Sequence, residues 1–436
     1  MKSTANITAK IALICTSGRR WTILSVENQR HTKGDLAQMQ SLPLTAKIRM
    51  TKERIKAWYE SWWRYEIYDK ATGKTRFVTF DNRDYSAEPP MKETEYIASA
   101  FPGAVYVSFS GGKDSTVLKH IVDSIYSDVP SVFVNTGLEY PEIQHFVREV
   151  KAGKYDCFNP DVEILRPEMR FDEVIKKYGY PIISKEVSNT VSGARKNIRD
   201  GKYSLRLRQL GVHRDEYGGL YDSGKHDYEK TVTRSKFTQN KWRFLLDSDF
   251  EVSEKCCYHT KKAPSKKYEN ETGRKPLIAT MACESMTREA AWMKKGCNAF
   301  DAQRPTSQPM SFWTEQDVLH YIKKYDVPYC SVYGDIQVKP HDNALHGQID
   351  LIDYLGAYEP EDQLMTTGYS RTGCIFCMFG CHLEKEPNRF QRLKETHPRQ
   401  YDYCINGGEM VDGKWQPNKE GLGLGYVLDY IGVPYK

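Results

Sequence analysis

The stretch VYVSFSGGKDSTVLKH, residues 106–121, decides the fold that we expect for this chain. It begins as an alternating apolar run, continues through two glycines and three serines, and ends in a helical pattern of apolar residues. Glycines let the backbone approach a ligand closely, and the amides that open a helix point toward an anion. The stretch therefore predicts a strand, an anion-binding loop and a helix, although it lacks the GxxxxGK[ST] spacing of a Walker loop.

Alternating strand and helix patterns follow this stretch along the chain. Residues 131–135 and 161–167 have strand patterns, and a helix pattern follows each of them. Helix patterns cover residues 141–150, 171–179, 284–295 and 314–327, and a further strand pattern covers residues 276–282. Repeated units of this kind predict an α/β fold, in which helices cover a parallel sheet.

The chain outside this core divides into segments of different composition. Residues 48–63 have the pattern of an amphipathic helix, and residues 64–80 that of a hairpin around KATGK. Residues 195–243 contain 13 Lys or Arg against 6 Asp or Glu, with aromatic residues between them. We divide the chain into an N-terminal extension at 1–95, an α/β core at 96–194, a basic insertion at 195–250, a cysteine-containing part of the core at 251–405 and a closing segment at 406–436.

The composition describes a globular protein of two or three folding units. A chain of 436 residues exceeds one typical core, and 39% hydrophobic with 28% charged residues excludes a disordered protein. We find no apolar run of membrane-spanning length, and the run IALIC at residues 11–15 is too short for a secretory signal. We therefore expect a cytoplasmic protein without a membrane partner, and its net charge of +6 permits an anionic ligand.

Five of the eleven cysteines form two groups, Cys256 with Cys257, and Cys374 with Cys377 and Cys381. In a cytosolic protein, clustered cysteines indicate metal binding or catalysis more often than disulfides. The adjacent pair and the CxxC pair provide the four thiolates that a [4Fe–4S] cluster or a structural zinc ion requires. Cys381 is a spare ligand, a catalytic thiol or a core residue, and Cys404 is a second candidate thiol.

Several of these motifs together resemble a known family. SGGKDS after an apolar strand resembles the pyrophosphate loop of the adenine nucleotide α-hydrolase superfamily, which includes ATP pyrophosphatases and the phosphoadenosine phosphosulfate (PAPS) reductase family. NTGLEYPE at 135–142 resembles the DTG…PE segment of PAPS reductase relatives, with Asn135 in place of Asp. EKCCYHTKKAP at 254–264 and SRTGCIFCMFG at 370–380 resemble the CC…K and GC…C motifs of iron–sulfur adenylyl-sulfate (APS) reductases. The resemblance covers residues 96–405 and implies a Rossmann-like (HUP-type) sheet with helices on both faces and an adenine nucleotide at the carboxyl ends of its strands.

The resemblance also implies the residues of the site. The nucleotide would contact Ser108, Ser110, Gly111, Gly112, Lys113, Asp114, Ser115, Gly137, Lys185, Glu284, Ser285 and Arg288, with Mg²⁺. A [4Fe–4S] cluster would be held by Cys256, Cys257, Cys374 and Cys377. The catalytic candidates are Lys113, Asp114, Cys381 and Cys404. A solvated lysine is the alternative for Lys185, and a surface ion pair is the alternative for Arg288.

Two departures from the family decide the reaction that we expect. APS and PAPS reductases carry a degenerate loop and end in an ECGxH-type segment, whereas this chain keeps SGGKDS and has no such segment. An intact loop has donors for a β,γ-pyrophosphate, which a sulfonucleotide does not possess. We therefore expect an enzyme that binds ATP and cleaves it between the α and β phosphates, to activate an acceptor for sulfur transfer.

The partners and the alternative functions follow from the same motifs. A nucleic-acid acceptor, tRNA or DNA, would bind the basic segment 195–243. The alternative is that this segment is a long solvated loop without a nucleic-acid partner. A protein that donates electrons or sulfur is a further partner. The first alternative function is an APS or PAPS reductase that releases sulfite, and the second is a redox-sensing nucleotide-binding protein without enzymatic activity.

Overall fold

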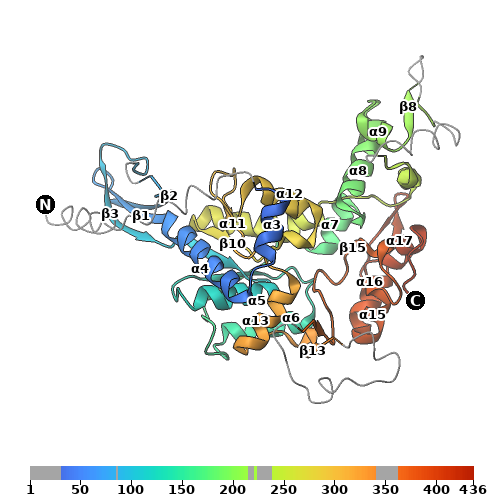
Figure 1. Cartoon of the computed structure of the whole chain (residues 1–436). Coiled ribbons are helices and arrows are strands. Elements are labelled where there is room, and N and C mark those ends of the chain that lie inside the picture. The colour runs from blue at the N-terminus through green and yellow to red at the C-terminus, as the bar shows by residue number, and fades with distance from the viewer. Residues whose placement is uncertain (1–30, 85–86, 215–219, 223–237, 340–361) are drawn as a thin grey trace, which may run out of the picture. The chain divides into compact units, whose positions relative to one another are not determined.

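The computed structural model describes residues 31–84, 87–214, 220–222, 238–339 and 362–436 (Figure 1). The predicted nucleic-acid segment 195–243 lies partly outside these ranges. The described chain forms two compact units. Unit 1 consists of residues 1–133, 141–164 and 267–371, and unit 2 of residues 134–140, 165–266 and 372–436.

Unit 1 contains a six-stranded sheet, which confirms the predicted α/β architecture. Its strand order is β11-β12-β10-β4-β5-β6. The strands are β4 Val105–Ser108, β5 Ser131–Val134, β6 Val162–Leu165, β10 Lys275–Leu277, β11 Asn298–Ala299 and β12 Thr306–Ser307. β4 pairs in parallel with β10 on one side and with β5 on the other, whereas the edge strand β11 is antiparallel to β12. β4 therefore lies in the interior of a mostly parallel sheet.

The strand β4 and the helix α5 form where the opening sequence predicts them. Val105, Tyr106 and Val107 are at most 1% exposed, which is typical of a central strand buried on both faces. α5 spans Lys113–Asp123. The other helical elements of unit 1 include α6 Pro141–Lys151, η3 Ala282–Glu284, α12 Met286–Lys295, α13 Glu315–Tyr325 and η4 Ser331–Tyr333. The predicted helices at 141–150, 284–295 and 314–327 are thus confirmed.

The strand predicted at 276–282 is shorter than expected. β10 ends at Leu277, and the chain enters η3 at Ala282. Ile278 still donates a backbone hydrogen bond to Ser307 of β12, at 2.9 Å. The chain therefore leaves the sheet after Ile278 and leads into the loop that carries Glu284.

The N-terminal part of unit 1 contains the predicted helix and hairpin. Its elements are α3 Lys33–Gln40, α4 Leu44–Ser61, β1 Trp62–Asp69, β2 Lys74–Asp81 and β3 Glu95–Pro102. β1 pairs with β2 as a hairpin from Trp62 with Asp81 to Asp69 with Lys74. β3 pairs with the other edge of β1 and, like α3, has no clear signal in the sequence. These strands make a separate three-stranded antiparallel sheet.

Unit 2 is mostly helical and carries the C-terminal part of the chain. Its principal elements are α7 Phe171–Tyr178, β7 Ile182–Ile183, α8 Lys185–Arg199, α9 Leu205–Gln209, η1 Asn240–Asp247, η2 Tyr258–Lys262, β15 Met378–Phe379, η6 Cys381–Leu383, α15 Arg389–Thr396, α16 Pro398–Ile405 and α17 Leu424–Tyr430. β7 and β15 form a short parallel pair. α7 confirms the helix predicted at 171–179, whereas α8 was not predicted. In the described part of the chain, we find no helix that is long and apolar enough to cross a membrane.

A buried ion pair stabilises the C-terminal half of α5. Lys119 Nζ lies 2.9 Å from Asp123 Oδ2, and the two side chains are 0% and 4% exposed. The ammonium also donates to Ser131 Oγ at 3.0 Å and to the Asn159 carbonyl at 2.7 Å. Replacing Lys119 by methionine leaves the Asp123 carboxylate buried without its cation. We expect the free energy of unfolding to fall by about 3–5 kcal/mol, as measured by urea denaturation.

The control for this prediction is an exposed ion pair in the same unit. Lys56 and Glu53 lie 3.4 Å apart, and both side chains are 45% exposed. Replacing Lys56 by methionine should cost less than about 1 kcal/mol. Equal losses for the two variants would show that the buried pair contributes no more than a surface pair.

Candidate functional site

The conformation of the loop between β4 and α5 depends on Gly111, a position where a side chain would not fit. Gly111 has φ +72°, and a Cβ added to it would lie 2.9 Å from the side chains of Ile143 and Val147 on α6. Any larger residue would therefore strain the backbone and push the loop away from α6. Gly112 is the N-cap of α5, so the loop leads directly into the helix N-terminus.

Two serines close the loop on itself. Ser110 N donates to Ser115 Oγ at 3.1 Å, and the two hydroxyl oxygens lie 3.0 Å apart. Ser115 Oγ in turn donates to the Gly112 carbonyl at 2.9 Å. Ser108, at the end of β4, completes the predicted loop residues of unit 1. The hydroxyls thus hold a preformed loop at a helix N-terminus, where the helix dipole and the first amides favour an anion.

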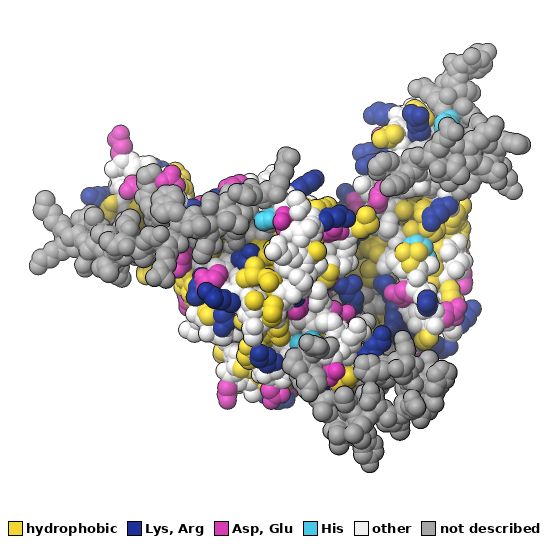
Figure 2. All heavy atoms as spheres, viewed as in Figure 1, with side chains coloured by type: hydrophobic (Ala, Val, Ile, Leu, Met, Phe, Trp, Pro, Cys, Tyr) yellow, Lys and Arg dark blue, Asp and Glu magenta, His cyan; other side chains and the backbone are white. Residues whose placement is uncertain are grey.

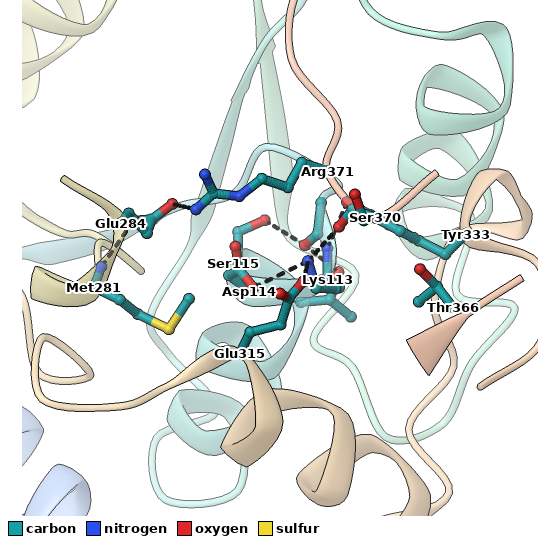
Figure 3. A network of polar contacts seen from close by, with 12 residues as sticks. Lys113, Asp114, Ser115, Met281, Glu284, Glu315, Tyr333, Thr366, Ser370 and Arg371 are labelled. Atoms are coloured by element: carbon teal, nitrogen blue, oxygen red, sulfur yellow. Dashed lines mark hydrogen bonds and ion pairs between the residues drawn. The ribbon is translucent and has the colours of Figure 1, made fainter. Parts of the chain in front are cut away.

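Lys113 is held in place by residues from distant parts of unit 1. Its side chain is 4% exposed, and Nζ lies 2.7 Å from the Ser370 carbonyl and 3.0 Å from Glu315 Oε1 (Figure 3). Its backbone N–H donates to the Tyr333 hydroxyl at 3.1 Å. Ser370, Glu315 and Tyr333 were not predicted from the sequence as partners of Lys113. The ammonium therefore lies at the start of α5, within reach of an anion at the loop.

Asp114 has one oxygen that nothing in the described structure satisfies. Its Oδ1 is buried without a hydrogen-bond partner, and Lys113 Nζ lies 3.9 Å away. Burial raises the pKa of this carboxyl, and the charge of Lys113 opposes the shift. A carboxylate oxygen with unused acceptor capacity beside a phosphate loop is the kind of ligand that Mg²⁺ prefers. The donor chemistry therefore fits the implied Mg²⁺.

The predicted ES…R segment forms a charged cluster with a residue that was not predicted. Glu284 Oε1 accepts from Arg371 Nη2 at 2.9 Å, and Oε2 accepts from Arg288. Ser285 does not join this cluster through its hydroxyl, which caps α12 by accepting from the Arg288 backbone N–H at 3.3 Å. Arg371 lies three residues before Cys374, and sequence analysis treated this stretch only as a cysteine motif.

Gly137 and Lys185, both predicted nucleotide contacts, belong to unit 2. Gly137 has φ +75° in a turn that Asn135 closes by accepting from the Gly137 N–H at 3.0 Å. Lys185 opens α8, where Ser184 is the N-cap. A hydrogen bond from Lys185, together with its charge, contributes to a lowered pKa of Cys257. The structure thus brings Lys185 to Cys257, and its contact with a nucleotide stays a prediction.

The four predicted metal ligands are neighbours in unit 2. The sulfurs of Cys256 and Cys257 lie 3.8 Å apart. Cys374 and Cys377 share a turn, in which the Cys377 N–H donates to the Cys374 carbonyl at 3.1 Å. The hydrogen bond that Cys256 donates to Cys257, together with burial, raises the pKa of Cys256, and the charges of Cys374 and Cys377 add to the shift. All four thiols therefore lie within electrostatic range of one another.

Two lysines, Lys185 and Lys261, lie close to these cysteines. A hydrogen bond from Cys256 and the charges of Lys185 and Lys261 lower the pKa of Cys257 to about 6. Lys261 also contacts Cys374. Within the described ranges, no three or more Cys, His, Asp or Glu side chains are grouped closely enough to hold a metal ion. The donor set of four thiols beside two cations nevertheless fits a group that requires thiolates.

The two candidate catalytic thiols lie in the core. Cys381 is 1% exposed, its Sγ donates to the Met378 carbonyl at 3.0 Å, and burial raises its pKa to about 12. Cys404 is 0% exposed, and burial raises its pKa as well. A nucleophilic cysteine needs its thiolate and an accessible sulfur. Both environments therefore favour a packing role, and the catalytic role of these thiols stays a prediction.

Comparisons with known proteins agree with this arrangement of motifs. The family described as "Phosphoadenosine phosphosulfate reductase domain" matches residues 104–198 and 220–379, more than half of the chain. An uncharacterized protein of Methanocaldococcus jannaschii is 27% identical over 150 residues, which are 34% of this chain and 32% of that relative. The crystal structure of a phosphoadenylyl-sulfate reductase from Candida auris, as a phosphate complex, matches 53% of this chain and 76% of its own chain, with 15% identity and a TM-score of 0.28.

Proposed function

Because the chain belongs to the phosphoadenosine phosphosulfate reductase domain family, we propose that it is an iron–sulfur enzyme that cleaves ATP between the α and β phosphates. The cleavage would activate an acceptor for sulfur transfer. The family membership establishes the Rossmann-like, HUP-type α/β fold and a nucleotide-binding ancestry. The observation that carries the finer proposal is the intact SGGKDS loop, which is preformed at the N-terminus of α5.

The residues of the loop have distinct roles in this proposal. The amides at the start of α5 and the Lys113 ammonium would bind the β and γ phosphates and stabilise the charge that develops on the departing pyrophosphate. To do so, Lys113 would exchange its bond to the Ser370 carbonyl for one to a phosphate oxygen. Asp114 would hold Mg²⁺, which supplies positive charge to the phosphate oxygens when bound.

The cysteines of unit 2 would hold the second cofactor. Cys256, Cys257, Cys374 and Cys377 provide the thiolates for a [4Fe–4S] cluster, which supplies redox or sulfur chemistry when bound. The charges of Lys185 and Lys261 favour the thiolate of Cys257, and the charge of Lys261 also favours that of Cys374. A zinc ion could use the same four sulfurs, so the metal content decides between the two.

The acceptor that we favour is a nucleic acid. Around α8 and α9 the exposed basic residues outnumber the acidic ones, and Figure 2 shows Lys and Arg side chains over α9. The exposed basic residues there are Lys185, Lys196, Arg199, Lys202, Arg206 and Arg208, and the exposed acidic residues are Glu186 and Asp200. Such a surface can contact phosphates without reading the base sequence. The electron or sulfur donor would be a separate protein.

One assay tests the proposal against its alternatives. Anaerobically reconstituted protein is incubated with ATP, APS or PAPS and a reductant. Pyrophosphate released from ATP supports the proposed function, whereas sulfite released from APS or PAPS supports the reductase. The cysteine motifs shared with APS reductases favour the reductase, and the burial of Cys381 and Cys404 weighs against it. Bound nucleotide without either product would support a nucleotide sensor.

A further inference from the structure

Glu284 holds two arginines that come from separate parts of unit 1. Arg288 lies one turn further along the chain in α12, whereas Arg371 is 87 residues away from Glu284. Each guanidinium bonds to a different oxygen of the carboxylate. Glu284 Oε2 also accepts from the Met281 backbone N–H at 3.0 Å, as part of a capping box (Figure 3). The carboxylate is therefore fixed to the backbone, and it fixes both guanidinium groups.

The hydrogen bonds of this cluster join two cations to one anion. Two guanidinium groups share one carboxylate, whereas Arg76 and Glu95 on the N-terminal sheet form a matched pair. The side chains of Arg288 and Arg371 are 45% and 59% exposed. Burial and the charge of the neighbouring Arg371 lower the pKa of Arg288, and the charge of Asp114 opposes the shift. An exposed pair of guanidinium groups, each with five N–H donors, is suited to an added anion.

The two arginines lie beside the SGGKDS loop. Ser370, which precedes Arg371 in the chain, accepts the hydrogen bond from Lys113 Nζ at 2.7 Å. The charges of Arg371 and Arg288 both act on the carboxyl of Asp114, in the first turn of α5. An anion held by the arginines would therefore lie next to phosphates held by the loop.

We propose that Arg288 and Arg371 form a second oxyanion subsite, which binds the α-phosphoryl group of an adenine nucleotide while the loop binds the phosphates beyond it. The identity of this ligand rests on the proposed function. The guanidinium fork matches the oxygens of a tetrahedral phosphoryl group, and its charge stabilises that group while the bond to the pyrophosphate breaks. Glu284 is a positioning residue, since it orients both arginines.

Binding of the two halves of ATP tests the subsite. AMP carries the α-phosphoryl group, and pyrophosphate represents the part bound by the loop. Arg371→Gln should weaken AMP binding by about 10- to 100-fold, the loss of one charge-assisted contact, and pyrophosphate binding by less than about threefold. Lys113→Ala should do the reverse. Calorimetric titration of the full chain measures all four affinities, and Arg371→Lys should fall between wild type and Arg371→Gln.

The controls separate this proposal from others. Arg76→Gln removes a matched ion pair elsewhere in unit 1 and should change neither affinity. The proposal is overturned if Arg371→Gln weakens pyrophosphate as much as AMP, leaves both unchanged, or weakens only a short oligonucleotide. Catalysis plays no part in these titrations. A wild-type protein that cleaves no ATP, but whose AMP binding depends on Arg371, would refute the proposed function and support the subsite.

A measurement on the wild-type protein does not depend on the folding of variants. Cys283 precedes Glu284, is exposed, and its thiol is within the electrostatic range of Arg371 and Asp114. Cys157 is also exposed in unit 1, but its thiol is within range of Asp123, at the other end of α5. AMP at ten times its Kd should slow alkylation of Cys283 by up to about tenfold and leave Cys157 unchanged. Equal rates at Cys283 with and without AMP would overturn the proposal.

Discussion

Replacing Lys113 by alanine is expected to slow pyrophosphate release from ATP by about 100- to 1000-fold, the usual cost of removing one group that stabilises developing charge. Lys113 is 4% exposed and held at the start of α5 by Ser370 and Glu315. Water cannot easily replace an ammonium at such a position. Because the same residue binds the ground-state phosphates, KM should rise while kcat falls.

Two further variants show whether charge at this position is what matters. Lys113→Arg keeps the cation and should retain more activity than Lys113→Ala. Lys74→Ala removes an exposed lysine from β2 and should leave the rate unchanged. The melting temperature of each variant is measured in parallel, so that a loss of folding is not mistaken for a loss of catalysis. Full turnover by a folded Lys113→Ala protein would falsify the assignment of the loop.

The second large effect concerns the cysteine cluster. Replacing Cys377 by alanine should lower the bound iron of anaerobically purified protein by at least about tenfold and weaken the visible thiolate-to-iron absorbance, because Cys377 would supply one of the four thiolates that hold the cluster. Cys377 contributes one half of the CxxC pair, and Arg389 donates to its carbonyl at 2.8 Å. Iron analysis and absorption spectra measure the loss.

Neighbouring cysteines provide matched controls for this prediction. Cys381→Ala, four residues further on, should keep its iron, because the Cys381 sulfur is buried against the Met378 carbonyl. Cys157→Ser, in unit 1, should also keep it. If Cys381→Ala loses its iron and Cys377→Ala retains it, then Cys381 is the cluster ligand and Cys377 is not. A wild-type protein that contains zinc and no iron would contradict the iron–sulfur proposal.

The strand β4, the loop and the helix α5 could be predicted because neighbouring residues in the sequence encode each of them. The apolar run of β4, the two glycines and the pattern of α5 are adjacent in the sequence, and each reflects burial or backbone freedom at its own position. The short strand β3 gave no such signal. Of its eight residues, Glu95–Pro102, four are partly buried and four are exposed, so the strand has no fully buried face. Its pairing with β1 is a tertiary contact.

The partners of the site residues could not be predicted for the same reason. Ser370 and Tyr333 contact Lys113 across 257 and 220 residues, and Arg371 reaches Glu284 across 87. No periodicity or spacing encodes such pairs. The proximity of Lys185 to Cys257 is a further contact that no local pattern indicated, because the two residues lie far apart in the sequence.

The order of strands in the sheet also means that the ribosome synthesises β4 long before its neighbour β10. Val107 of β4 pairs with Leu277 of β10, which the ribosome adds 170 residues later. At a rate of synthesis of roughly 5–20 residues per second, one edge of β4 stays unpaired for about 10–30 s. During this interval an apolar strand with an open edge can pair with another chain. Chains that end before β10 should therefore aggregate, and slower initiation or chaperones should raise the yield of the intact protein.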